Sequence, residues 1–480
     1  MPRSAAPPNG CACETTSPGR AKHELEEDVL MTADVLSRPD VATEPCFLTA
    51  SIAAASIRAR HLSCEELLRS CLKRIERRDG DIRAWLHIEP EQALRAAREN
   101  DKTPARHALH GLPWGVKDVY DTIDLPTTQN SAIYSATQAG RDAACVATVR
   151  HCGGLILGKT DTVEFAANGR KALTRNPHDL SRTPGGSSSG SAAAVADFHV
   201  PLAFGSQTIG SHLRPASFTG IYAFKPSWGA ISREGLKMNA ASMDTVGWYG
   251  RSVPDLRLAA SAFSFLAEDT PPARTIRGLR VGLCRTPSWS KIEPAGEATL
   301  MAAAARLAGA GAIVEDLNLP AAFEDLFQAY LDIYYSEGGR AFQPELLASP
   351  ALLAAPLREQ AENRRSLDKT RLREAYGVAD RCRLLFDDLF GPDLDVVLTP
   401  SAPGEAPVGL ENTGSSVFNG YWTILHAPCV GIPAGRAPGG MPVGISLVGR
   451  RFDDMALLAL AELLSPAIDE QDGLGGRIAD

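Results

Sequence analysis

Short apolar runs alternate with helix-like stretches along most of this chain, and that alternation limits the folds open to it. The runs PWGVKDVY, GLILG, LRVGLC and DVVLTP have the length of strands, while residues 144–151 and 297–308 have helical patterns. Alternation of this kind is typical of an α/β fold in which helices cover a largely buried sheet. We therefore predict one α/β domain, without internal repeats.

The two ends of this domain follow from changes in composition. Residues 1–45 are rich in Pro, Ser, Thr, Ala and charged residues and have little apolar periodicity, which favours a disordered or loosely attached tail. The domain is predicted to span residues 46–475, beginning with a helical region over 48–101 in which Ser63 is an N-cap. Residues 320–392 are mostly helical and separate two strand-like parts, so they are predicted to form a cap over one edge of the sheet.

Composition and charge exclude several classes of partner. The chain has 480 residues, of which 44% are hydrophobic and 22% charged, enough to bury a large core. Its net charge of −8 is spread without long like-charged blocks, so it offers no electrostatic footprint for nucleic acid or an anionic membrane. The start lacks the apolar core of a secretory signal, and no run approaches the roughly 20 apolar residues of a membrane span. We therefore predict a cytoplasmic protein without nucleic-acid or membrane partners, and leave open a homodimer.

Two familiar motifs occur in contexts that argue against their usual roles. Residues 153–160, GGLILGKT, match the phosphate-loop pattern, but a predicted helix precedes them and their apolar centre resembles a buried strand. Residues 186–190, GSSSG, match the nucleophile elbow, but the preceding TRNPHDLSRTP contains two prolines and a single aliphatic residue. Since an elbow needs an apolar strand running into it, neither motif is predicted to act in its usual way.

A third arrangement of residues is more specific. Every position from Gly185 to Ser191 is glycine or serine, a lysine lies upstream at Lys117, and a second glycine-flanked serine follows at Ser211. A serine hydroxyl attacks an amide only when a base removes its proton, and lysine can serve as that base if burial lowers its pKa. His212 is a competing base, but it directly follows Ser211, and adjacent side chains usually diverge.

In these segments the sequence resembles the amidase signature family, whose hallmark is a Ser-cisSer-Lys triad. The resemblance runs from about Leu48 to Leu464, and Ser187 lies 70 positions after Lys117 and 24 before Ser211. The segments that carry it are GVKD, LGKTDTVEFA, TRNPHDLSRTPGGSSSGSAAAVA, FKPSWGAISREGL, SMDTVGWYGRSVPD and MPVGISLVGR. The family implies a single domain with a mixed central sheet covered by helices on both faces and a helical cap region.

The resemblance also implies a role for each matching residue. Lys117 would be the general base, Ser187 the bridging serine after a cis Gly186-Ser187 bond, and Ser211 the nucleophile. The oxyanion hole would consist of backbone N–H groups, those of Thr208, Ile209, Gly210 and Ser211. The remaining loop hydroxyls would hydrogen-bond the loop backbone.

Some positions depart from the commonest family pattern or have an open role. Ser189 and Ile209 stand at glycine positions, and Gln207 stands where Asp is frequent. Gly186, Gln207 and Arg214 are candidate substrate-binding residues, and Arg214 is either a structural partner for a carboxylate or a clamp for an anionic substrate group. The stripe Phe323, Phe327, Tyr330 and Tyr334 either packs in the core or forms an aromatic wall.

The predicted function is hydrolysis of a small-molecule carboxylic amide, or an ester or carbamate, through an acyl-enzyme, with no metal and no organic cofactor. One alternative is the glutaminase subunit of a tRNA-dependent amidotransferase, which depends on partner subunits. Another is a family member that has lost catalysis and acts only by binding; the complete set of Lys117, Ser187 and Ser211 argues against it.

Overall fold

Eleven strands form one mixed sheet in the computed structural model, which describes residues 44–266 and 275–469. The predicted tail, residues 1–45, lies almost entirely outside the described residues, as does the end of the predicted domain. The strands lie in the order β1-β3-β2-β4-β6-β5-β10-β11-β9-β7-β8. Their bounds are β1 (Trp85–Ile88), β2 (Pro113–Lys117), β3 (Leu155–Thr160), β4 (Leu202–Gln207), β5 (Tyr222–Lys225), β6 (Thr245–Gly250), β7 (Arg280–Cys284), β8 (Ile313–Leu317), β9 (Val396–Pro400), β10 (Cys429–Arg436) and β11 (Pro442–Val448).

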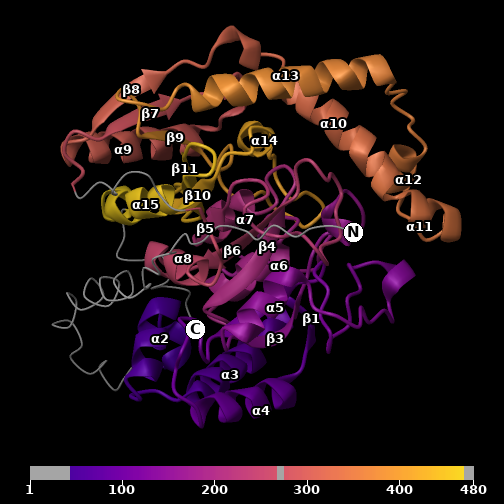
Figure 1. The fold of residues 1–480 in the computed structure, drawn as a ribbon, viewed down its shortest axis with the longest axis vertical. Helices are drawn as coiled ribbons and strands as arrows, with labels where there is room; N and C mark the ends of the chain where they lie inside the picture. Colours follow the sequence, from indigo (N-terminus) through magenta and orange to yellow (C-terminus); the bar gives the residue numbers. More distant parts are fainter. Residues whose placement is uncertain (1–43, 267–274, 470–480) are drawn as a thin grey trace, which may run out of the picture. The chain divides into compact units, whose positions relative to one another are not determined.

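Helices surround this sheet (Figure 1). Helix α6 packs against β4, while α7 packs against β10 and β11. The predicted fold class, an α/β domain with a mixed sheet covered by helices, is confirmed. The α-helices are α2 (Ala50–Arg58), α3 (Cys64–Ile82), α4 (Pro90–Asp101), α5 (Ala144–His151), α6 (Ser189–Ala196), α7 (Leu213–Thr219), α8 (Val253–Ala260), α9 (Pro294–Gly309), α10 (Leu326–Ala341), α11 (Gln343–Ala348), α12 (Ala355–Ala361), α13 (Lys369–Asp387), α14 (Val417–Ile424) and α15 (Asp454–Ile468).

Single turns of 3-10 helix complete the secondary structure of the described residues. They are η2 (Pro45–Phe47), η3 (Ala132–Tyr134), η4 (Glu164–Ala166), η5 (Trp289–Lys291) and η6 (Ala321–Phe323).

The pairing of β2 with β4 brings together residues that are far apart in the sequence. The two strands are parallel, with Val116 opposite Phe204, so both end at the same edge of the sheet. Lys117 is the last residue of β2, and the segment after β4 leads directly to the predicted nucleophile, Ser211. Because carboxyl ends of neighbouring parallel strands form a common crevice, this edge is where a ligand site is expected.

The region predicted as helical over residues 48–101 contains one strand. Ser63 caps α3 as predicted: its side chain accepts a hydrogen bond from the backbone N–H of Glu66, whose side chain in turn accepts from Ser63. Trp85–Ile88, however, forms β1, which pairs antiparallel with β3 at the edge of the sheet. A four-residue edge strand is too short to show alternation in the sequence, so tertiary pairing decides its conformation.

Residues 320–392 are helical as predicted, and their aromatic stripe serves two purposes. Helix α10 packs against α13 and α14. Phe323 and Tyr330 are fully buried, so the core-packing interpretation holds for them. Tyr330 stacks on Phe327 and Tyr334, and Tyr334 also lines a cavity beside Ser211. The stripe therefore connects the helical region to the predicted site.

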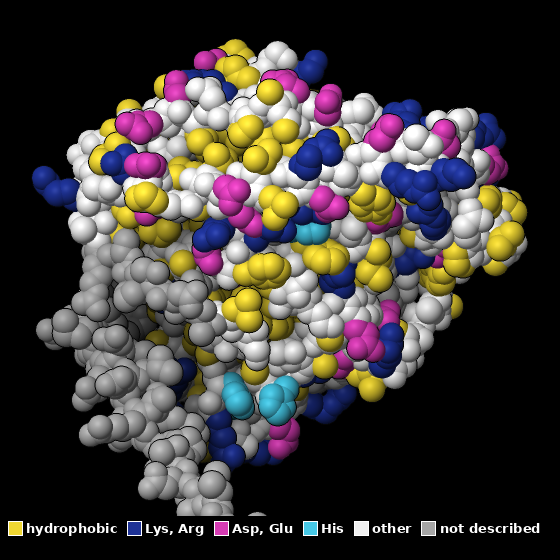
Figure 2. Space-filling view, turned by 45° about the horizontal axis from the view of Figure 1, so that its top comes forward, with side chains coloured by type: hydrophobic (Ala, Val, Ile, Leu, Met, Phe, Trp, Pro, Cys, Tyr) yellow, Lys and Arg dark blue, Asp and Glu magenta, His cyan; other side chains and the backbone are white. Residues whose placement is uncertain are grey.

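The surface is charged but mixed in sign. On the face that Figure 2 shows, side chains of both charges lie among hydrophobic ones. Among the residues described, none of the helices is both long and apolar enough to cross a membrane.

Candidate active site

Lys117 is fully buried at the end of β2. Its Nζ donates hydrogen bonds to Ser187 Oγ at 2.7 Å and to Ser206 Oγ at 2.8 Å. No carboxylate within the described ranges forms an ion pair with it, and burial lowers the pKa of Lys117 well below its usual range, an effect that the charge of Asp244 partly opposes. A buried amine without a counter-ion favours its neutral form, and that form has a lone pair that can accept a proton.

The Gly/Ser loop places Ser187 against this amine. The peptide bond between Gly186 and Ser187 is cis, as predicted. The other hydroxyls donate to backbone carbonyls, Ser189 to Gly185 at 2.7 Å and Ser191 to Phe204 at 2.8 Å. Gly190 is required by a close approach, because a Cβ there would lie 2.2 Å from the carbonyl oxygen of Ala84. Glycine at this position thus allows the loop to pack against the backbone of Ala84 and of Asp161, which follows β3.

Ser211 lies in the turn between β4 and α7 and is 9% exposed. Ser187 and Ser211 both line a cavity of about 280 Å³. The Ser211 hydroxyl makes no hydrogen bond to any residue that the structure describes, so its contact with Ser187 is not formed in this conformation. Serine hydroxyls rotate about a single bond, so the direction of the Ser211 hydroxyl can change when a substrate binds.

The turn before Ser211 presents unused backbone donors. Within residues 44–266 and 275–469, no hydrogen bond is made by the backbone N–H groups of Thr208, Ile209, Gly210 and Ser211. Thr208, Ile209 and Ser211 line the cavity. Unpaired backbone N–H groups at a buried turn are costly unless a ligand or water accepts from them, so this turn is suited to stabilise a negative oxygen.

Arg214 makes its hydrogen bonds to the protein backbone and to one hydroxyl. Its guanidinium donates to Gly414 O at 2.9 Å, to the carbonyl oxygen of Gly186, and to Thr413 Oγ1 at 3.2 Å. These acceptors are carbonyl and hydroxyl oxygens. The sequence-based prediction of a structural role for Arg214 had expected a carboxylate as its partner. Arg214 therefore holds the loop around Gly414 against the carbonyl that precedes Ser187, and it also lines the cavity.

Gln207 and Gly186 lie behind the cavity wall. Gln207 is fully buried, and its Oε1 accepts from the backbone N–H groups of His212 and Leu213 at 3.1 and 3.0 Å. Since its amide is occupied at the start of α7, we expect Gln207 to position the Ser211 turn rather than to touch substrate. A Cβ on Gly186 would lie 2.7 Å from Thr413, so this position needs glycine for space.

The phosphate-loop match and the competing base, His212, both have structural roles. Residues 155–160 of the phosphate-loop match form β3 after helix α5, and Lys159 is buried in an ion pair with Asp118 at 3.1 Å. His212 is stacked on Tyr249, and burial lowers its pKa to about 3. Its Nε2 lies 3.1 Å from the carbonyl oxygens of Phe224 and Trp248, so that nitrogen serves as a donor.

Two further residues near the site, Ser206 and Asp244, were not predicted from the sequence. Ser206 shares the Lys117 amine with Ser187. Asp244 is buried, burial raises its pKa to about 6, and it accepts hydrogen bonds from Thr208 Oγ1 and from the N–H of Asn239 at 2.6 Å. Ser206 could have been noticed in the segment GSQTIGS and Asp244 in the segment SMDTVG. Neither segment shows by itself what the serine or the aspartate side chain contacts.

We expect Ser206→Ala to lower kcat/KM for amide hydrolysis by about tenfold, because the amine loses one of the two hydrogen bonds that orient it. A purely structural role would lower the melting temperature without altering the pH profile. Loss of orientation at Lys117 should instead shift the pH at which kcat/KM rises, and Ser206→Thr, which keeps the hydroxyl, should restore it.

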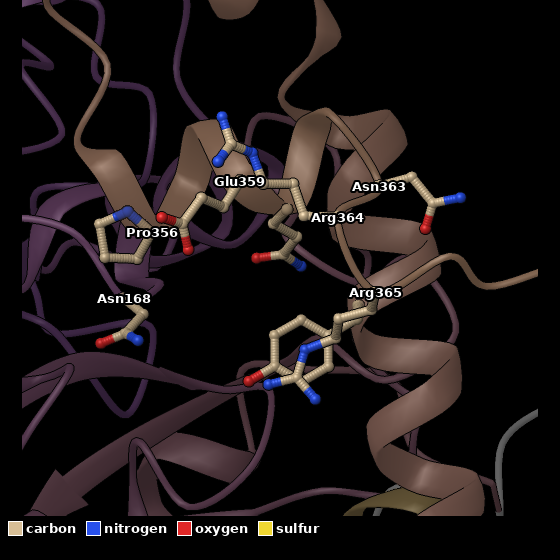
Figure 3. Close-up of a pocket in the computed structure, with 8 residues that line it drawn as sticks. Asn168, Pro356, Glu359, Asn363, Arg364 and Arg365 are labelled. Carbon is tan, nitrogen blue, oxygen red and sulfur yellow. The ribbon is translucent and has the colours of Figure 1, made fainter.

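A second cavity, of about 390 Å³, adjoins the first. Asn168 and Tyr335 line both cavities. Figure 3 shows Asn168 on one side of this second cavity and Asn363 and Arg365 on the other. The catalytic cavity therefore continues toward helix α12 and the segment that follows it.

The chain is similar in sequence and in fold to known proteins. The Amidase family model matches residues 66–458. A relative from Chloroflexus aggregans, named as a subunit of glutamyl-tRNA(Gln) amidotransferase, is 32% identical and covers 89% of this chain and 98% of its own length. A solved amidase structure is 25% identical with a TM-score of 0.78, covering 88% of this chain and 100% of that one. The solved amidotransferase subunit from Thermotoga maritima has a TM-score of 0.73 at 24% identity, covering 88% and 95%.

The names of the relatives contradict the prediction that the protein has no nucleic-acid partner. Several relatives of 31–33% identity are named as the same glutamyl-tRNA(Gln) amidotransferase subunit. The prediction rested on a net charge of −8, and charge reports only on direct contact between a chain and a polyanion. One member of an assembly can take part in a reaction on RNA without carrying a basic surface of its own, so the inference from charge was wrong.

Proposed function

Since the chain belongs to the amidase signature family of enzymes that hydrolyse carbon–nitrogen bonds, we propose that it cleaves a carboxylic amide through an acyl-enzyme on Ser211. The observation that supports this most strongly is the 2.7 Å contact between Ser187 and a buried lysine, Lys117, that has no ion-pair partner in the described part of the chain. Ser187 lines a cavity whose wall also includes Ser211.

The first half of the reaction moves two protons in a relay and forms one bond. In its neutral form, Lys117 accepts the Ser187 proton through the 2.7 Å contact while it donates to Ser206 at 2.8 Å. Ser187 in turn takes the Ser211 proton as Ser211 Oγ attacks the carbonyl carbon. The negative charge that develops on the carbonyl oxygen is stabilised by the backbone N–H groups between Thr208 and Ser211.

The second half reverses the proton path. The amine of Lys117 now carries the proton, which returns through Ser187 to the leaving nitrogen as the carbon–nitrogen bond breaks. Water then enters, loses a proton to the same relay and attacks the acyl-enzyme, releasing the carboxylic acid and restoring Ser211. Because the amine begins and ends neutral, the relay needs no external acid or base.

The relatives favour one form of this activity, that of the glutamine-hydrolysing subunit of an amidotransferase. The relatives that carry the amidotransferase name cover 86–89% of the chain, and the cavity of about 280 Å³ beside Ser211 has room for a short polar amide. The test is to purify the chain from its native host and to assay ammonia release from glutamine, alone and with any protein that copurifies in equal amounts. Glutaminase activity that requires such a partner supports this form.

A free-standing amidohydrolase is the second candidate. The observation in its favour is the likeness to the solved amidase, at 25% identity over 88% of this chain with a TM-score of 0.78. This form predicts that the purified chain hydrolyses amides without a partner. If neither preparation releases ammonia or amine from any amide in a broad panel, both forms of the proposed function fail.

A further inference from the structure

The carbonyl groups of the turn before the nucleophile are occupied, although its N–H groups are not. Thr208 O accepts a hydrogen bond from the Tyr330 hydroxyl at 3.3 Å, and Ile209 O accepts one from Thr423 Oγ1 at 2.8 Å. Gly210 O accepts from a backbone N–H in the first turn of α7. Three consecutive carbonyls of this turn therefore point into the protein.

The direction of each carbonyl determines the direction of the N–H group that follows it. No cis bond among the described residues lies in this turn. In a planar trans peptide unit the C=O and the N–H point in opposite directions. A carbonyl held against α10 or α14 therefore turns the next N–H, that of Ile209 or that of Gly210, away from these helices. Both N–H groups make no hydrogen bond within the described part of the chain, so they are available to a ligand.

The Tyr330 hydroxyl on α10 is a donor with a fixed position. Its ring is fully buried and stacks on Phe327 and on Tyr334. Burial also raises the pKa of Tyr330, so its hydroxyl keeps the proton that Thr208 O accepts. A ring packed in this way can hold the carbonyl with little freedom to move.

The Thr423 hydroxyl on α14 is directed by a second hydrogen bond. Thr423 is buried, and its Oγ1 accepts from Gln207 Nε2 at 3.1 Å. Its own proton has two acceptors within reach, Ile209 O at 2.8 Å and Asn419 O at 3.2 Å, and the first is the closer. Aspartate, which is frequent in the family at position 207, has no side-chain N–H to donate. The contact that directs Thr423 therefore depends on the glutamine of this chain.

We propose that Tyr330 and Thr423 are positioning residues of the oxyanion hole. They hold two consecutive carbonyls and thereby aim the N–H groups of Ile209 and Gly210 at the oxygen of the substrate carbonyl. Neither side chain is part of the cavity wall, so each acts through the backbone. The inference rests on the proposed function, because an oxyanion forms only if Ser211 attacks a carbonyl. It gives the helical region over residues 320–392 a part in catalysis, since α10 belongs to that region.

The test measures how fast a serine-reactive fluorophosphonate labels the purified full chain, because the phosphonyl oxygen needs the same N–H groups as a substrate oxyanion. Tyr330→Phe removes one oxygen atom, and Thr423→Val replaces a hydroxyl with a methyl group. Each change should lower the maximal rate of labelling by about tenfold and leave the half-saturating concentration of the reagent unchanged. The double variant should be about a hundredfold slower, because the two side chains hold different peptide units.

Two matched controls remove buried hydroxyls away from this turn. Tyr222→Phe removes a hydroxyl that donates to Asp469 at 2.9 Å, and Thr219→Val removes one that donates to Pro215 O at 2.8 Å. Both controls should be labelled at the native rate. Thr423→Ser keeps the donor and should recover most of the rate that Thr423→Val loses.

The readouts separate positioning from a role in folding alone. A folding role would lower the melting temperature and would not lower the maximal rate selectively. The pH dependence of labelling should stay as in the native chain, because the variants leave Lys117 in place. The proposal is overturned if Tyr330→Phe is labelled at the native rate, if the losses are no larger than in the controls, or if Thr423→Ser is as slow as Thr423→Val. A native chain that takes no adduct would overturn the proposed function as well.

Discussion

Ser211→Ala should take no adduct from a serine-reactive fluorophosphonate and should lose amide hydrolysis by a factor on the order of 10⁴ or more. The reason is that the reagent and the substrate need the same nucleophilic oxygen. Ser211 lines the cavity beside unpaired backbone N–H groups, whereas Ser189 and Ser191 are committed to backbone carbonyls. Intact-protein mass spectrometry of the labelled native chain and variant measures the first effect directly.

The control for this prediction is Ser415→Ala, a change at a serine on the neighbouring loop whose hydroxyl accepts from the N–H of Val417 at 3.4 Å. It should be labelled as the native chain is. If Ser211→Ala is labelled as fast as the native chain, the nucleophile has been assigned to the wrong residue. A native chain that takes no adduct at all would instead favour the binding-only member of the family.

The parts of the fold that could be predicted are those that local sequence determines. The runs PWGVKDVY, GLILG, LRVGLC and DVVLTP form β2, β3, β7 and β9, because a strand buried on both faces needs a nearly continuous apolar run. Strand β1 could not be predicted, since its four residues depend on pairing with β3. The partner of β1 lies about 70 positions later in the chain, outside the short stretch of sequence over which periodicity can be measured.

The same limit applies to the site. Lys117, Ser187 and Ser211 were found because each lies in a recognisable segment, and the parallel pairing of β2 with β4 brings these segments together. The cavity as a whole could not be predicted, because its wall combines residues that lie far apart in the chain, such as Asn168, Tyr335 and Thr413. Arg214 was ambiguous for a related reason, because its acceptors on the loop at Thr413 and Gly414 are distant in the chain.

Lys117→Met should lower kcat/KM by about 10³-fold, since the relay loses its base while the nucleophile and the oxyanion donors remain. The pH profile is the more specific readout. Burial lowers the pKa of Lys117, and only the neutral amine can accept a proton, so the native rate should rise with pH through that pKa and be level above it. Below that pKa the amine is protonated and the rate should fall. Lys117→Met should lose this ascending limb.

Lys117→Arg separates a base from a positive charge at the same position. A guanidinium stays protonated across the working pH range, so it keeps the charge but cannot accept the Ser187 proton. If Lys117 acts as a base, the Arg variant should be as inactive as the Met variant, with melting temperatures that show both to be folded. Substantial activity in Lys117→Arg, or an unchanged pH profile in Lys117→Met, would mean that the amine only holds the loop at Ser187 and that the proton leaves Ser211 by another route.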